Sequence, residues 1–199
     1  MVRIFTALGL MSGTSGDGID ASIIQSNGTD KYKEVLNRYF AYNTEIYENL
    51  HKLRDKILKI GDLEKYSNEI NNLEKELTLF HAKVVKQIFE IFDQRIDLIG
   101  FHGQTIYHNA KEKVSRQLGN GNLLSQLTKT NVIYDFRQND IKNGGEGAPL
   151  SPIFHKLIVE QNKIELPVCI LNIGGISNIT FVHKKNQYLL FSRDLGPGN

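Results

Sequence analysis

The chain opens with two apolar runs, residues 4–10 and 19–24, that enclose a short polar loop rich in glycine. This arrangement is typical of a β-hairpin, so we expect strands over residues 2–10 and 19–26. A third strand is expected over residues 34–41, where bulky side chains alternate weakly with polar ones. The pattern therefore predicts that the chain begins with three consecutive strands.

Helical spacing follows. The first helix is expected to begin at Asn43 or Thr44 and to stop at Gly61. Its apolar positions lie three or four residues apart: Ile46, Leu50, Leu53 and Ile57. A longer helix is expected after Asp62, with one apolar stripe that ends by Phe92 and so favours a core or subunit contact over a coiled coil.

The rest of this first unit alternates short apolar strands with helical segments. Strands are expected at 97–101 and 131–134, helices at 123–128 and 150–160 (opened by Pro149), and a polar loop at 139–147. A helix followed by an apolar strand favours parallel addition to a sheet. The sequence therefore predicts an α/β fold.

Pro167 marks a boundary, and the pattern beyond it repeats the opening of the chain. Strands are expected at 168–173, 179–182 and 188–191, with a Gly174–Gly175 turn after the first and an exit loop at 194–199. We therefore expect two units, residues 1–165 and residues 166–199. Since no helical pattern follows to cover the second unit, we expect a longer protein or a partner that completes it.

Composition is that of a globular protein. Of 199 residues, 40% are hydrophobic and 23% are charged, and the net charge is +2 without a basic cluster, which argues against nucleic acid as a partner. The one cysteine, Cys169, lies in an apolar run and is expected to be buried in a strand. Neither a signal peptide nor a window of membrane-spanning length is apparent, so we expect a cytoplasmic protein without a membrane partner.

The loop Ser12–Gly18 carries the first candidate chemistry. Its three glycines let backbone N–H groups point into one concavity, which is how a loop binds phosphate, and its hydroxyl side chains add donors. Asp17 and Asp20 are suited to hold Mg²⁺ through water. An ordinary glycine-serine turn is equally compatible with the composition. The loop is neither a Walker A loop nor a dinucleotide fingerprint, because no helical pattern follows it.

Two further polar segments follow short strands. His102-Gly-Gln-Thr105, with His108 beyond it, comes after the strand at 97–101, and Asp135-Phe-Arg137 comes after the strand at 131–134. Ligands of open α/β sheets bind at the carboxyl ends of the strands, so these segments are candidate site residues. The alternatives are a purely structural His102 and an ion pair of Arg137 with Asp135 or Asp140.

Six segments, in this order along the chain, resemble the anhydro-N-acetylmuramic acid kinase family of the sugar kinase/Hsp70/actin superfamily. They are Met11–Asp20, Gly100–Ile106 with His108, Asp135–Arg137, Gly144–Leu150, Asn172–Asn178 and Asp194–Asn199. The resemblance covers essentially the whole chain. It implies an actin-like ATPase (ribonuclease H-like) fold, with residues 1–165 as a complete first lobe and residues 166–199 as the opening strands of a second.

The resemblance also implies a reaction. Family members cleave the 1,6-anhydro bond of anhydro-N-acetylmuramic acid and phosphorylate O6 with ATP, which gives N-acetylmuramate 6-phosphate in bacterial cell-wall recycling. It further implies Mg²⁺ as a cofactor, a homodimer, and two domains that close on the substrates.

Site residues follow from the same resemblance. Asp194 would activate the attacking water, as the base does in an inverting glycosidase, although a turn-capping aspartate is the alternative. The ATP phosphates would lie against Gly13, Thr14, Ser15, Gly16, Asp17, Gly18, Ile19 and Asp20, with Asp17 nearest the metal. The sugar would contact His102, Gln104, Thr105, Arg137, Glu146 and Asn178, and Arg137 would pair with the lactyl carboxylate.

The chain departs from the usual family pattern in places. Gly16 stands where leucine is usual, Leu195 replaces a threonine beside Asp194, and Arg193 adds a cation that would weaken Asp194 as a base. The family's C-terminal half, with the adenosine pocket, has no counterpart here. The alternatives are therefore a degenerate fragment that binds a ligand or partner without turnover, and another sugar kinase of the same fold.

Overall fold

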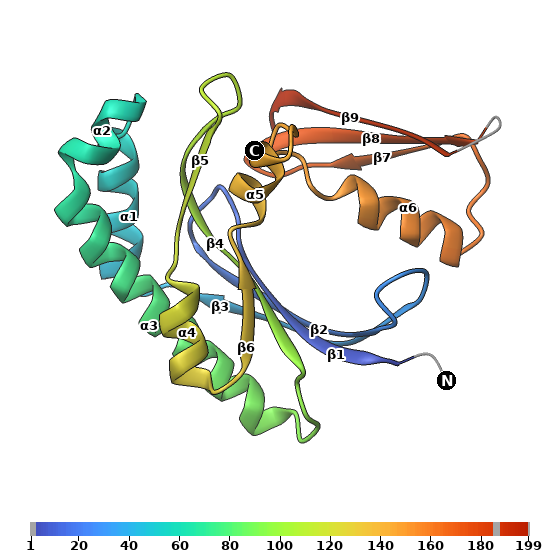
Figure 1. The fold of residues 1–199 in the computed structure, drawn as a ribbon, viewed down its shortest axis with the longest axis horizontal. Helices are drawn as coiled ribbons and strands as arrows, with labels where there is room; N and C mark the ends of the chain where they lie inside the picture. Colours follow the sequence, from blue (N-terminus) through green and yellow to red (C-terminus); the bar gives the residue numbers. More distant parts are fainter. Residues whose placement is uncertain (1–2, 185–187, 199) are drawn as a thin grey trace.

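The computed structural model describes residues 3–184 and 188–198, which form two β-sheets (Figure 1). Val2, where the first predicted strand begins, and Asn199, which ends the sixth segment, lie outside the described residues. One sheet has the order β3-β2-β1-β4-β5, with β6 paired to β4, and the other has the order β7-β8-β9. The strands are β1 (Phe5–Ser12), β2 (Gly18–Ser26), β3 (Tyr32–Ala41), β4 (Leu98–Asn109), β5 (Val114–Leu118), β6 (Asn131–Tyr134), β7 (Val168–Asn172), β8 (Ile176–Lys184) and β9 (Tyr188–Pro197).

The pairing of the first sheet confirms the predicted opening. Strands β1, β2 and β3 are successive antiparallel neighbours, and the predicted hairpin joins the first two. Strand β4 pairs parallel to β1, and β6 pairs parallel to β4, as the helix-then-strand pattern predicted. The sheet is therefore mixed.

The helices are α1 (Thr44–Lys56), α2 (Ile60–Lys65), α3 (Ser67–Ile91), α4 (Gly121–Thr128), α5 (Phe136–Lys142) and α6 (Pro152–Gln161). The cap of α1 is confirmed, because the Asn43 side chain accepts a hydrogen bond from the Ile46 N–H at 2.8 Å. The predicted stop at Gly61 is wrong. The Asp62 carboxylate accepts the backbone N–H groups of Leu58 and Lys59, at 3.0 Å each, and so starts α2 with Gly61 inside it.

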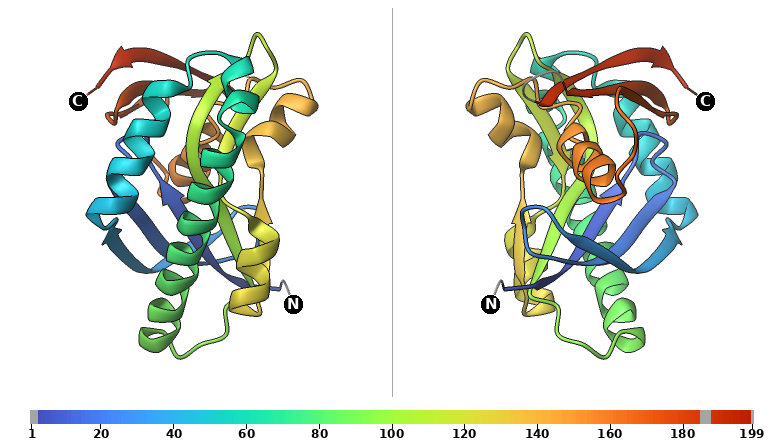
Figure 2. Two further views of the ribbon diagram at one scale, coloured as in Figure 1. Left: turned by 90° about the vertical axis from the view of Figure 1, so that its left-hand side faces the viewer. Right: turned by 90° about the vertical axis from the view of Figure 1, so that its right-hand side faces the viewer.

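Helices α1 and α3 cover one side of the large sheet, while α6 lies on the other side, between the two sheets (Figures 1 and 2). The core between the helices and the sheet includes completely buried side chains, each 0% exposed: Leu8, Ile19, Leu50, Leu77 and Ile99. Burying side chains of this size stabilises the fold by about 1.5–3 kcal/mol each. Loop 13–17 and the ends of β1 and β6 are therefore attached to a tightly packed core.

Strand β4 runs further than predicted. The sequence indicated a strand that ends at Phe101, but β4 continues to Asn109 and turns back into β5. Gly103 makes this possible with a φ of +70°, where a Cβ atom would lie 2.3 Å from the Leu118 carbonyl oxygen. The segment His102–Thr105 thus lies within a strand, level with the carboxyl ends of β1 and β6.

Two other segments also differ from expectation. Helix α5 occupies the first part of the predicted polar loop at 139–147 and begins already at Phe136. Strand β9 includes Asp194, which was expected in an exit loop. In both places a polar composition concealed regular backbone hydrogen bonding, which is local within α5 and is supplied by β8 for β9.

The expectation that no helix covers the second sheet is wrong. Helix α6 lies against it, and the His155 Nδ1 atom is 2.8 Å from the Thr180 hydroxyl of β8. Cys169 of β7 is exposed, so its predicted burial is wrong. Several large apolar side chains of this region are nonetheless exposed by about half: Leu171 (54%), Ile173 (63%), Ile176 (48%), Phe191 (52%) and Leu195 (49%).

Within residues 3–184 and 188–198, none of the helices combines the length and the apolar character needed to traverse a lipid bilayer.

Candidate functional site

The loop between β1 and β2 is a tight turn pressed against α1. The Gly16 N–H donates to the Gly13 carbonyl oxygen at 3.2 Å, and Arg54 Nη1 of α1 donates to the Thr14 carbonyl oxygen at 2.6 Å. Gly16 is buried with a φ of +65°, and a Cβ atom there would lie 2.8 Å from Leu50 Cδ2. Glycine is therefore required for this close approach.

The backbone of this loop offers free donors. No described residue accepts a hydrogen bond from the N–H groups of Thr14 or Ser15, and both residues are exposed. Free N–H groups on an exposed glycine-rich turn form a concavity that suits an anion such as phosphate. The loop therefore fits the phosphate group of a nucleotide.

A buried cluster of polar side chains holds the loop in place through hydrogen bonds. The Gln104 side chain is 0% exposed, donates from Nε2 to the Gly13 carbonyl oxygen at 3.0 Å, and bonds the Ser12 hydroxyl through Oε1. The Tyr42 hydroxyl donates to Ser12 Oγ at 2.9 Å, and burial raises the pKa of Tyr42. Gln104, expected to face a ligand, is thus the residue that fixes the loop to β4.

His102 and Arg137 form a second polar unit. Arg137 Nε donates to His102 Nε2 at 2.8 Å, and Arg137 Nη1 donates to the Gly147 carbonyl oxygen at 2.8 Å. His102 Nδ1 lies 2.7 Å from the Gly103 carbonyl oxygen, so the proton of the neutral ring is on Nδ1. Burial lowers the pKa of His102 to about 4, and the positive charge of Arg137 adds to this shift. Both ring nitrogens are therefore occupied.

The alternative partners of Arg137 are not used. Among the described residues neither Asp135 nor Asp140 pairs with it; Asp140 Oδ2 instead accepts the Gly147 N–H at 2.8 Å. No described residue accepts from Arg137 Nη2. Burial lowers the pKa of Arg137, and the Asp194 carboxylate opposes this shift. A half-buried guanidinium with one free nitrogen beside a carboxylate can receive an anionic or hydroxyl-rich ligand.

The second glycine turn brings Asp194 to the same region. A Cβ atom on Gly175 would lie 3.1 Å from Thr14 Cβ, so the turn that follows β7 touches the first loop. Asp194 pairs with Asn178 of β8, and the register shifts beside them because Leu195 is an extra residue on β9. Such a bulge re-aims the neighbouring side chains, and Asp194 is exposed.

Glu146 and His108 lie in the same electrostatic field. Burial lowers the pKa of His108, Arg137 adds to the shift, and the carboxylates of Asp194 and Glu146 oppose it. The charges of Arg137, Glu146 and Asp194 therefore all act on His108. Thr105 is half-buried and accepts a hydrogen bond from Gln117 Nε2 at 3.2 Å. The Asn178 Oδ1 atom is buried without a partner among the described residues.

The candidate metal residues suit indirect binding. Asp17 and Asp20 are both exposed, and Ser15 Oγ donates to Asp17 Oδ1 at 2.7 Å. No group of three or more potential metal ligands occurs among the residues that the structure describes. Mg²⁺ keeps several waters and needs only one or two carboxylates, so this donor set fits Mg²⁺ held partly through water and bound phosphate.

Three residues of this region were not singled out from the sequence. Tyr42 and Arg54 lie outside the six segments, and no sequence pattern distinguishes Arg54 from other charged residues of an amphipathic helix. His108 belongs to a recognised segment, but it was assigned no role. Its spacing of six residues from His102, an even number, is the signal that could have placed both on one strand face.

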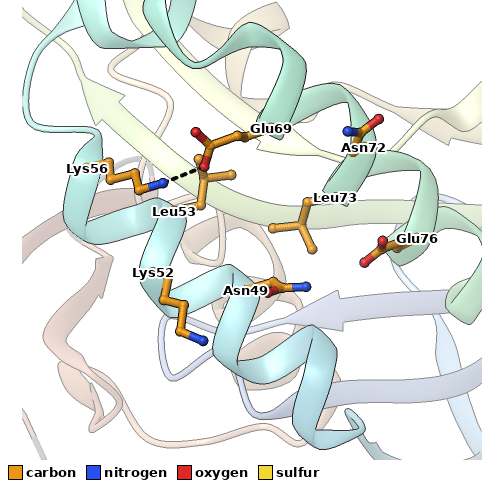
Figure 3. Close-up of a pocket in the computed structure, with 8 residues that line it drawn as sticks. All are labelled: Asn49, Lys52, Leu53, Lys56, Glu69, Asn72, Leu73 and Glu76. Atoms are coloured by element: carbon orange, nitrogen blue, oxygen red, sulfur yellow. Dashed lines mark hydrogen bonds and ion pairs between the residues drawn. The ribbon is translucent and has the colours of Figure 1, made fainter.

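One cavity lies away from the candidate residues, and another borders His102. A cavity of about 360 Å³ lies between α1 and α3, and none of the candidate residues lines it (Figure 3). Its rim carries the Lys56–Glu69 ion pair at 2.6 Å. A smaller cavity of about 170 Å³ borders His102 and Asp135.

Comparison with known proteins shows the family of the chain. A family model described as anhydro-N-acetylmuramic acid kinase matches residues 5–199. The protein of that name from Pelagibacter ubique (strain HTCC1062) is 59% identical over 199 residues, 100% of this chain and 53% of that protein. Those from Agrobacterium fabrum and Rhizobium etli are each 37% identical, over 100% and 98% of this chain and 54% and 53% of their own lengths.

The chain thus spans about half the length of the curated relatives it matches. Its mixed sheet with helices packed on it fits a sugar kinase or actin-like ATPase domain. Since the family model covers nearly every residue and the relatives are similar along the whole chain, the chain belongs to the anhydro-N-acetylmuramic acid kinase family.

Proposed function

We propose that this chain is part of an ATP-dependent kinase that hydrolyses the 1,6-anhydro bond of anhydro-N-acetylmuramic acid and phosphorylates O6. The product would be N-acetylmuramate 6-phosphate, an intermediate of cell-wall recycling. The observation that supports the proposal is the contact of the two glycine turns, Gly175 against Thr14; the second turn also accepts the Gly198 N–H, four residues after the proposed base Asp194. A reaction that opens a ring and phosphorylates the released oxygen needs both functions within reach of one sugar.

The phosphate loop holds the nucleotide in this proposal. Free N–H groups of Thr14 and Ser15 bind phosphate oxygens, and Gly13, Gly16, Gly18 and Ile19 shape the turn around them. Asp17 and Asp20 hold the waters of Mg²⁺. When bound, Mg²⁺ and ATP supply charge neutralisation and the phosphoryl group. Gln104 keeps the loop in register with β4.

Asp194 acts as general base. Its exposed carboxylate accepts a proton from the water that attacks the anomeric carbon, while the bond from that carbon to O6 breaks. Arg137 contacts the lactyl carboxylate through its free Nη2, and His102 holds Arg137 in place through Nε2. Thr105, Glu146 and the buried Asn178 Oδ1 are further contacts for sugar hydroxyl or amide groups.

The exposed apolar residues of the second sheet support a further part of the proposal. The chain is half the length of its relatives, and Leu171, Ile173 and Phe191 are more than half exposed. We propose that they are covered in the working enzyme, either by a C-terminal half or by the second subunit of a homodimer.

A coupled assay of ADP release with anhydro-N-acetylmuramic acid tests the proposal, on this chain alone and with a C-terminal half supplied. Asp194→Asn should reduce turnover by about 10³-fold or more while ATP still binds, because only the base is lost. Asp93→Asn, at an exposed position after α3, is the charge-matched control and should leave turnover unchanged.

Each outcome decides between the functions. An Asp194→Asn protein as active as the parent would overturn the role of Asp194. ATP binding without turnover under all conditions would instead support a kinase-like module that only binds ligand. Turnover of other sugars but not of the anhydro sugar would identify another sugar kinase.

A further inference from the structure

Arg54 is tied to the glycine loop although it lies forty positions away in the sequence. Its Nη1 donates to the Thr14 carbonyl oxygen at 2.6 Å. Arg54 stands on the last turn of α1, whose inward residues Leu50 and Leu53 are 0% and 3% exposed. The hydrogen bond therefore joins the loop to a helix that the core holds rigidly.

Gly16 brings the loop against the same helix. A Cβ atom at Gly16 would lie 2.8 Å from Leu50 Cδ2, 3.5 Å from Arg54 Nη1 and 3.5 Å from His51 Nε2. A side chain at position 16 would not fit this approach, so glycine permits the close seam between loop and helix.

The bond from Arg54 also orients the N–H that follows Thr14. In a trans peptide the C=O and the next N–H point in opposite directions. The Thr14 carbonyl points to α1, so the Ser15 N–H points away from the helix, and no described residue accepts from it. Fixing the carbonyl thus holds one free donor of the loop ready for an anion.

The charge of Arg54 is not neutralised by a carboxylate. Arg54 is half-buried, and among the residues that the structure describes it forms no ion pair with Asp or Glu. A guanidinium kept beside free N–H groups adds positive potential where a polyphosphate would bind. Its hydrogen bond to a carbonyl is charge-assisted and so stronger than a neutral one.

We propose that Arg54 is the positioning residue of the nucleotide loop: it docks the Thr14 carbonyl on α1 and thereby presents the Ser15 N–H to the ATP phosphates. This rests on the ATP binding proposed above. Arg54 acts through the loop rather than on the reacting atoms. The seam at Gly16 is what brings the loop within its reach.

The test uses the full chain with Arg54→Met, which keeps the length but removes the donors, and Arg54→Lys, which keeps the charge. Lys52→Met is the matched control, because Lys52 lies on the same helix, has a side chain 67% exposed and, among the described residues, pairs only with Glu48 of its own helix. Calorimetry gives the Kd for MgATP and for inorganic tripolyphosphate. Hydrogen exchange reports the peptide that covers residues 12–18.

Arg54→Met should weaken MgATP and tripolyphosphate about ten-fold and Arg54→Lys about three-fold, in line with one charged hydrogen bond. Loop amides should exchange faster in Arg54→Met, and Lys52→Met should match the parent in both measurements. A parent chain that binds neither ligand overturns the proposed function together with this role. A parent that binds ATP, with both Arg54 variants matching it in affinity and exchange, overturns the inference alone.

Discussion

His81 lies in surroundings that disfavour a charged ring. It is 0% exposed within α3, Nδ1 lies 2.7 Å from the Leu77 carbonyl oxygen, and Nε2 has no partner among the described residues. The aromatic ring of Phe101 packs on it with centroids 4.8 Å apart. Burial lowers the pKa of His81 to about 4, so the folded protein holds this ring neutral.

This gives the fold a defined pH dependence. The unfolded chain protonates His81 near pH 6.5 and the folded one only near 4, so unfolding takes up a proton in between. The free energy of unfolding should be highest above pH 6.5 and should fall by roughly 3 kcal/mol towards pH 4 from His81, with a similar tendency from His102. Urea titrations at several pH values measure this.

A His81→Gln variant should lose the His81 share of the slope and keep the share that His102 contributes. Equal free energies of unfolding at pH 7 and pH 4.5 in the parent protein would contradict the prediction.

At the scale of elements, Gly103 allows β4 to extend beyond Phe101. Gly103 has a φ of +70°, and its missing Cβ is what permits contact with the Leu118 carbonyl oxygen of β5. The bulge lets the strand leave its pairing with β6 at Phe101 and continue beside β5. The His102 segment gains its orientation from this bend.

Gly103→Ala should therefore destabilise the fold by about 3 kcal/mol or more, because both the backbone conformation and the clash oppose it. Gly28→Ala is the matched control, since Gly28 has a φ of +77° and nothing within 4 Å of its Cβ position. It should cost only about 1 kcal/mol. Chemical denaturation compares the two, and equal losses would show that the contact with β5 carries no weight.

Element prediction succeeded where one face of a segment is buried. The stripe of α3 and the cap at Asn43 are local features, so they can be found without the fold. Strand β5 and helix α5 were missed because polar residues dominate both segments and leave no clear apolar periodicity. Asp194 was placed in a loop for the same reason, since its strand is defined by pairing with β8.

At the scale of the whole molecule, the two sheets are joined at two places among the described residues. One is the meeting of the glycine turns at the candidate site. The other is Gln161 of α6, whose side chain accepts from the Tyr32 N–H and donates to the Tyr32 carbonyl oxygen, at 2.9 Å each. Phe154 adds a ring contact to Tyr32 with centroids 4.9 Å apart. Helix α6 thus fastens the second sheet to the edge of the first.

Gln161→Ala should loosen this attachment by about 1 kcal/mol, because two neutral hydrogen bonds are exchanged for bonds to water. Hydrogen exchange in α6 and β3 should then become faster. Asn162→Ala is the control, since the Asn162 side chain bonds the Ile158 carbonyl oxygen of its own helix. Faster exchange in both variants alike would point to loss of helix stability rather than of the contact.

The sequence by itself determined the opening three strands, the amphipathic helices and the segments that carry the chemistry, because periodicity, caps and residue types are properties of neighbouring residues. Only the tertiary structure decided that Gln104 bonds the loop, that His102 accepts a hydrogen bond from Arg137, and that Arg54 donates one to Thr14. Those pairs are joined across 91, 35 and 40 positions of sequence. Which polar group meets which is set by the packing of the elements that carry them, and no local pattern encodes it.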